Sequence, residues 1–146
     1  MTISVADTDG NVVHNGFSRQ GFVTATFESS EVTSNFELED INVTNGVASE
    51  FTASTSKIYT AKITPSAEGV CTVNVVAAKF TDGVGNDNTA ANGGTAFSFT
   101  QDLTVPTIAI TAAEVNSGES SNDAEINLTF TVTDANTVTF EKDDIT

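Results

Sequence analysis

Basic residues are scarce in this sequence. Its 146 residues include 5 Lys and Arg against 20 Asp and Glu, which gives a formal net charge of −15 at pH 7. Because nucleic-acid phosphates and anionic lipid headgroups are bound by clustered cations, this charge argues against a nucleic-acid partner and against binding to a membrane surface. The sequence also lacks an apolar run of the roughly 18 residues that a membrane helix needs, so we expect no membrane insertion. The N-terminal segment MTISVADTDG has neither the basic start nor the apolar stretch of a signal peptide.

Cysteine and histidine are equally scarce. The sequence has one cysteine, Cys71, and one histidine, His14, which excludes an internal disulfide and a histidine-rich metal site. Cys71 alternates with Val73 and Val75, so we expect a small buried hydrophobic residue rather than a nucleophile. His14 has no serine or cysteine partner pattern near it, and we expect it on a surface turn. Carboxylates are plentiful, but they fall mainly in loops without apolar surroundings, so the sequence predicts a protein that is not an enzyme. No glycine-rich phosphate loop follows a strand and opens a helix, which argues against nucleotide binding.

Strand-forming residues dominate what is present. There are 24 Thr, 16 Val and 10 Phe, and β-branched and aromatic residues favour strands. Apolar and polar residues alternate in seven short segments, at residues 2–6, 22–28, 41–44, 47–53, 57–64, 70–77 and 96–100. Asn45-Gly46 is a tight-turn signal between two of them. The pattern predicts an all-β fold, a seven-stranded antiparallel β-sandwich. The residues expected largely inside are Val23, Phe27, Ile41, Val43, Ile63, Val73, Val75, Phe97 and Phe99.

An internal repeat of about 105 residues divides the chain. Residues 23–27 match residues 128–132 in apolar pattern, and residues 36–41 match residues 140–145. We therefore expect a complete sandwich over residues 1–104. Residues 105–146 are expected to be a linker, stiffened by Pro106, and the first part of a second, incomplete repeat. The apolar face of that part then needs the rest of a second sandwich, covalently continuous or from a neighbouring subunit. The residues on this face are Ile108, Ile110, Leu128, Phe130 and Val132.

Three segments resemble bacterial Ig-like repeats. They are FESSEVTSNFELEDINVTNG at residues 27–46, AAKFTDGVGNDNTAA at residues 77–91 and FSFTQDLTVPTIAIT at residues 97–111. The resemblance covers the first repeat and the opening of the second. It implies a tandem array of Ig-like sandwiches in a large secreted adhesin or surface fibre protein, at the cell surface or outside the cell. The implied partners are copies of itself or adjacent repeats of the same chain.

Three functions are compatible with such a repeat. The leading hypothesis is a non-catalytic structural module of an extracellular filament, stalk or adhesin that assembles end to end, because repetition supplies length. A ligand-binding adhesin domain for carbohydrate or protein is the second hypothesis. With no Trp and one Tyr, the usual platform for stacking sugars is poorly supplied. An accessory β-sandwich of a secreted enzyme is the third.

Two oxygen-rich segments are candidate calcium ligands. Asp7, Asp9 and Asn11 match the first, third and fifth positions of a calcium-binding loop. Val12 stands where that loop needs glycine, and Ser18 where it needs a bidentate glutamate, so a complete EF-hand is excluded. The second candidate set lies at residues 82–88, with one further residue near the join. These residues are Asp82, Asn86, Asp87, Asn88 and Asp102. Asp and Asn also favour turns without a metal, and both interpretations remain open.

Two sequons are candidate glycosylation sites. Asn42 and Asn127 each begin an Asn-X-Thr motif, and alternation places both asparagines on the outer face of a strand. Chance occurrence in a chain rich in Asn and Thr is the alternative.

Overall fold

The computed structural model describes residues 1–134 and 140–145. They form two compact units, residues 1–103 and 104–146, which we call unit 1 and unit 2. The helices in the described residues are three short 3₁₀ helices, η1 (Leu38–Asp40), η2 (Ala91–Gly94) and η3 (Lys142–Asp144). Among the described residues, none of the helices has the length and hydropathy to span a bilayer.

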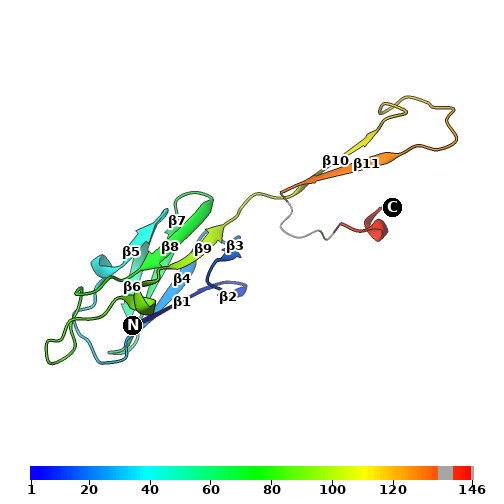
Figure 1. The fold of residues 1–146 in the computed structure, drawn as a ribbon. Helices are drawn as coiled ribbons and strands as arrows, with labels where there is room; N and C mark the ends of the chain where they lie inside the picture. Colours follow the sequence, from blue (N-terminus) through cyan, green and yellow to red (C-terminus); the bar gives the residue numbers. More distant parts are fainter. Residues whose placement is uncertain (135–139, 146) are drawn as a thin grey trace. The chain divides into compact units, whose positions relative to one another are not determined.

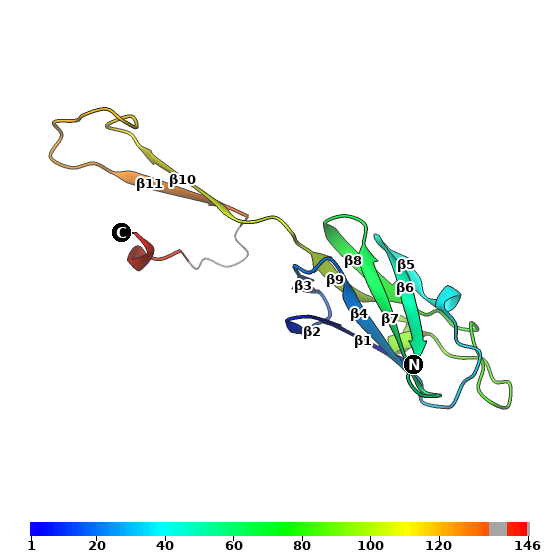
Figure 2. The same cartoon turned by 180° about the vertical axis from the view of Figure 1, so that it is seen from behind.

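Unit 1 consists of two facing β-sheets (Figures 1 and 2). The first sheet has five antiparallel strands in the order β2-β1-β4-β7-β6. The second sheet has four strands in the order β3-β9-β8-β5. The strands are β1 (Thr2–Asp7), β2 (Gly10–Val12), β3 (Gly16–Ser18), β4 (Val23–Glu28), β5 (Asn42–Thr44), β6 (Gly46–Ala53), β7 (Ile58–Pro65), β8 (Gly69–Asn74) and β9 (Phe97–Gln101).

The core lies between the two sheets, as the alternation predicts. Each strand places every second side chain inward. Eight of the nine residues expected inside are buried, and Val43 is partly buried against the same cluster. Phe36, just before η1, lies at the centre of an aromatic group with ring-centroid distances of 5.1–5.6 Å to its neighbours. These neighbours are Phe27, Phe51, Tyr59 and Phe80.

The strand count and one strand direction differ from the sequence prediction. Residues 1–103, all of which are described, hold nine strands rather than seven. The two additional strands, β2 and β3, have three residues each, which is too short for alternation to be visible. In addition, β3 pairs with β9 in parallel, so the sandwich is not wholly antiparallel.

The chain changes sheets at Asn45. β5 pairs with β8 in the second sheet, whereas β6 pairs with β7 in the first. The Asn45-Gly46 turn signal therefore marks a crossing between sheets rather than a hairpin. Asn45 has a φ of 52°, which asparagine tolerates better than most residues. A Cβ atom on Gly46 would lie 2.9 Å from the carbonyl oxygen of Thr64, so the crossing requires glycine.

Unit 2 contains one antiparallel strand pair, β10 (Thr107–Ala112) and β11 (Leu128–Thr133), followed in the described residues by η3. The expected apolar residues of this unit are exposed or only partly buried. Phe130 contacts Phe140, with ring centroids 5.3 Å apart. A two-stranded sheet buries only a small apolar area, which accounts for this exposure.

Candidate functional site

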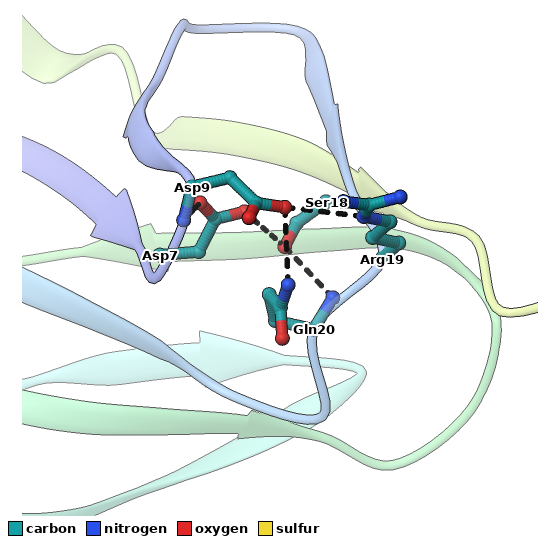
Figure 3. Close-up of polar contacts among 5 residues, drawn as sticks. All are labelled: Asp7, Asp9, Ser18, Arg19 and Gln20. Carbon is teal, nitrogen blue, oxygen red and sulfur yellow. Dashed lines mark hydrogen bonds and ion pairs between the residues drawn. The ribbon is translucent and has the colours of Figure 1, made fainter.

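The first oxygen-rich segment forms the turn between β1 and β2 (Figure 3). The backbone N–H of Asp9 donates to Oδ1 of Asp7 at 2.9 Å, and the hydroxyl of Ser18 donates to Oδ2 of Asp7 at 2.7 Å. Both carboxylate oxygens of Asp7 therefore accept hydrogen bonds within unit 1. This is the local turn chemistry that aspartate favours, and it ties the turn to the end of β3.

The carboxylate of Asp9 makes a further contact, with the segment that follows β3. Its Oδ2 accepts from Nε2 of Gln20 and from Nε of Arg19, both at 3.1 Å. The Gln20 hydrogen bond, followed by the Arg19 hydrogen bond and charge, holds the pKa of Asp9 below its usual value. The side chains of Asp9 and Arg19 are solvent-exposed, so water screens their ion pair. Asn11, the third candidate ligand in this segment, is exposed on β2 opposite Ala6.

The second oxygen-rich segment is a loop closed by Asp82. Its Oδ1 accepts from the backbone N–H groups of Val84 and Asn86 at 2.9 and 2.8 Å, and its Oδ2 accepts from Nδ2 of Asn86 at 2.7 Å. These bonds, led by that of the Asn86 side chain, lower the pKa of Asp82. The hydrogen bonds that fold the loop thus favour the ionised form of the carboxylate.

Asn88 and Asp87 fix the return of the same loop. The Asn88 side chain accepts from the backbone N–H groups of Lys79 and Phe80, and it donates to the carbonyl oxygen of Val76 at 2.9 Å. Asp87 pairs through its backbone with Thr81 in an isolated antiparallel bridge. Of this segment's candidate ligands, Asp82 and Asn88 thus each use both polar atoms of the side chain to fold the loop.

The candidate calcium ligands lie at two different ends of the sandwich. Asp7, at the end of β1, is joined through Ser18 to Asp102, whose backbone N–H donates to the Ser18 carbonyl at 3.0 Å. The 82–88 loop lies instead beside Met1, where β1 begins. In the described residues, no three His, Cys, Asp or Glu side chains come together as a metal-binding group. The calcium interpretation stays a prediction.

The connection that leaves β9 is held by contacts that sequence reasoning did not predict. Ser18 lies beside Gln101 through the parallel β3–β9 pairing, and the backbone N–H of Leu103 donates to Oε1 of Glu68 at 2.8 Å. These partners are far apart in the sequence and come together only through the sheet order. No local pattern signals them.

A shallow groove of about 240 Å³ lies at the opposite end, and sequence reasoning also missed it. The segment 29–33 forms one side, and Phe80 with the 82–89 loop forms the other. Its acidic residues are Glu31, Asp82 and Asp87, and none of the described residues that line it is a lysine or an arginine. The groove follows from the packing of two loops that are about 50 residues apart in the sequence.

Both sequon asparagines are exposed, as alternation predicts. Asn42 lies on β5, an edge strand, and the Thr44 hydroxyl of its sequon is 2.6 Å from that of Thr72. Asn127 precedes β11, and its side-chain nitrogen donates to Oε1 of Glu114 at 2.9 Å, which lowers the pKa of Glu114. Glycosylation stays a prediction at both positions.

Cys71 and His14 occupy the positions expected of them. Cys71 is buried, and burial raises the pKa of its thiol to about 11, so the reactive thiolate is suppressed. His14 is exposed on a turn, where its Nδ1 accepts from the backbone N–H of Ser98 at 3.2 Å and its ring lies edge-on to Phe97.

Unit 1 is thus an Ig-like β-sandwich, and the polar side chains described above form hydrogen bonds within its own loops. The model of the bacterial Ig-like domain family matches residues 1–99, more than half of the chain, and the chain belongs to this family. The match confirms the resemblance drawn from the sequence. Searches of curated proteins and of solved structures found no match.

Proposed function

We propose that this chain is a structural module of an extracellular filament, stalk or adhesin, arranged end to end with other modules of its kind. The observation that carries the proposal is the path of the chain through unit 1. β1 begins at Thr2, beside the loops of the groove, and β9 ends at Gln101, beside Ser18 and Asp7. The chain therefore enters unit 1 at one end of the sandwich and leaves at the other, which is the geometry that a linear array needs.

The strand register in unit 2 supports a tandem repeat. Thr2 pairs with Glu28 in unit 1, and Thr107 pairs with Thr133 in unit 2, so both partners are displaced by 105 residues. Five further partner pairs in unit 2 follow the same antiparallel order along β10 and β11. Two copies of one fold share their strand register, because shifting the pairing of two strands by one residue would turn every side chain to the opposite face of the sheet.

The short helices support the same relation. Before η1, the backbone N–H of Glu37 donates to the carboxylate of Asp40 at 3.0 Å. Before η3, the backbone N–H of Glu141 donates to the carboxylate of Asp144 at 2.8 Å. Both helices carry the same reciprocal capping arrangement, 104 residues apart. This agreement favours unit 2 as the opening of a second Ig-like module.

Surface display tests the proposal. An antibody raised against unit 1 should bind intact cells that produce the protein, and external protease should remove that binding while a cytoplasmic marker stays intact. Signal that appears only after the cells are lysed would refute an extracellular role. Electron microscopy of the released material should show linear particles, and compact particles would refute end-to-end arrangement.

A further inference from the structure

The end of β9 buries a polar side chain on a face that is otherwise aromatic. The inward residues of β9 are Phe97, Phe99 and Gln101, and Gln101 is 2% exposed. Neither Nε2 nor Oε1 of its amide has a hydrogen-bond partner among the described residues. A buried polar group that is left unsatisfied destabilises the fold, so buried amides are bonded to protein or to ordered water. The Gln101 amide therefore requires a partner that the surrounding protein atoms do not supply.

Ser18 is the neighbour of Gln101 on one side. The two residues pair in the parallel register of β3 and β9, and both side chains are buried. Adjacent strands lie about 4.8 Å apart, so one small molecule can reach both the hydroxyl and the amide. Oγ of Ser18 donates to Asp7 (Figure 3) and accepts from the backbone N–H of Gln20 at 3.3 Å. Among the described residues, these bonds leave one acceptor position of the Ser18 hydroxyl open.

Gly69 is the neighbour of Gln101 on the other side. The two residues pair in the register of β8 and β9, and a Cβ atom added to Gly69 would meet no heavy atom within 4 Å. Serine, glutamine and glycine thus form a row across the end of the second sheet, with little side-chain volume on either side of the glutamine. A bound water molecule needs a volume of about 30 Å³ and two to four polar partners. The row supplies both the room and the partners.

We propose that the row Ser18, Gln101 and Gly69 binds an internal water molecule. The water accepts from Nε2 of Gln101 or donates to its Oε1, and it donates to Oγ of Ser18. It thereby joins β9 to β3 and, through the bond from Ser18 to Asp7, to the end of β1. A cation is a poorer occupant, because it would leave the Nε2 donor without an acceptor. The water site lies within unit 1, so it does not depend on an end-to-end arrangement of modules.

Magnetisation transfer from water to side-chain amide protons tests the proposal, measured by nuclear magnetic resonance on the full, isotope-labelled chain. The sequence contains two glutamines, which form a matched pair. Gln101 is buried, whereas Gln20 is partly exposed and donates to Asp9. We expect Overhauser peaks between water and the Gln101 amide with the sign of a long-lived complex. Gln20 should show only the signal of rapidly exchanging surface water. In Ser18→Ala, the Gln101 peaks should lose most of their intensity, because the water loses one of its partners.

A double-variant cycle measures whether the two residues share the water. Urea unfolding is compared for Ser18→Ala, Gln101→Met and the double variant. Residues bonded to one water are coupled, so the unfolding constant of the double variant should differ from the product of the single effects by at least about twofold. The matched control combines Gln101→Met with Phe17→Ala, because Phe17 lies on the same strand as Ser18 but is exposed. Its two effects should be independent.

Three results would overturn the proposal. The first is a Gln101 amide without long-lived water peaks. The second is a set of peaks that keeps full intensity in Ser18→Ala. The third is independence of the Ser18 and Gln101 effects, because a hydroxyl that merely exchanges protons with solvent would give water peaks without energetic coupling.

Discussion

Replacing Phe36 by alanine should destabilise unit 1 more than any single surface change. Phe36 is 3% exposed, and its ring contacts four other aromatic rings from β4, β6, β7 and the segment before the 82–88 loop. It therefore joins the first sheet to the loops at the groove end. Removing the ring leaves a cavity bordered by rigid aromatic side chains, which cannot collapse to fill it.

The expected cost follows from burial and ring contacts. Truncating a buried phenylalanine to alanine costs about 3–5 kcal/mol. Favourable aromatic pairs add about 0.5–1.5 kcal/mol each beyond the area they bury, although such pairs are not additive. We expect about 4–5 kcal/mol, since every neighbouring ring loses its partner. A domain of this size has about 5–15 kcal/mol of total stability, so the variant should be folded only marginally.

Urea unfolding measures this cost, and the chain supplies its own probe. Tyr59 is the one tyrosine in a sequence without tryptophan, and it packs against Phe36 at 5.1 Å. Its fluorescence therefore reports on unit 1 alone. With a slope of about 2 kcal/mol per molar urea, the midpoint should fall by roughly 2 M.

Phe17→Ala is the matched control for this variant. Phe17 lies on β3 and is 54% exposed, so its removal should change stability by less than about 0.5 kcal/mol. A loss at Phe36 of under about 1.5 kcal/mol, or one equal to the loss at Phe17, would refute the placement of the aromatic core.

Three further predictions concern backbone geometry, pH and metal. Gly46→Ala should lower the free energy of unfolding by about 1–3 kcal/mol, because the added Cβ would meet the Thr64 carbonyl. Gly21→Ala, where the added Cβ meets nothing, should cause no such loss, and equal urea midpoints for the two variants would contradict this. Burial raises the pKa of Tyr59, so the folded state holds the phenolic proton more tightly and stability should fall as the pH rises above about 10, in addition to the fall that the raised pKa of Cys71 causes. Circular dichroism should show this slope, and Tyr59→Phe should make it shallower while leaving the part due to Cys71. The hydrogen bonds that Asp7 and Asp82 already accept favour turn chemistry, so excess chelator should leave the melting temperature unchanged. If millimolar calcium raised the melting temperature and chelator reversed that increase, a calcium site would be established instead.

Alternation along the strands made most of unit 1 predictable. In Val23–Glu28, each apolar residue is buried and each residue between them is more exposed, as a strand with one core face requires. β2 and β3 could not be predicted in this way, because three residues hold too little of the pattern. The parallel pairing of β3 with β9 depends on a contact between residues more than 80 positions apart, which no local signal encodes.

The candidate sites were less predictable than the fold. The sequence predicts Asp7 and Asp82 as candidate calcium ligands, with turn chemistry as the alternative, and in the structure both carboxylates accept hydrogen bonds within their own turns. Their specific partners depend on tertiary packing: Ser18 reaches Asp7 because β3 returns beside the end of β1. The groove depends in the same way on the packing of two distant loops, so its lining residues have no common motif.

Single-molecule extension measures whether unit 1 is one self-contained module that bears load between its two ends. The full chain is pulled from residue 1 and residue 146. Tension then runs along β1 and β9 in opposite directions, and the hydrogen bonds between β1 and β4 lie across the pull and resist it together. We expect one major unfolding step that releases roughly 300 Å of chain, given about 3.3–3.6 Å per extended residue. Release of unit 1 in several smaller steps, or extension without a resisting step, would contradict it.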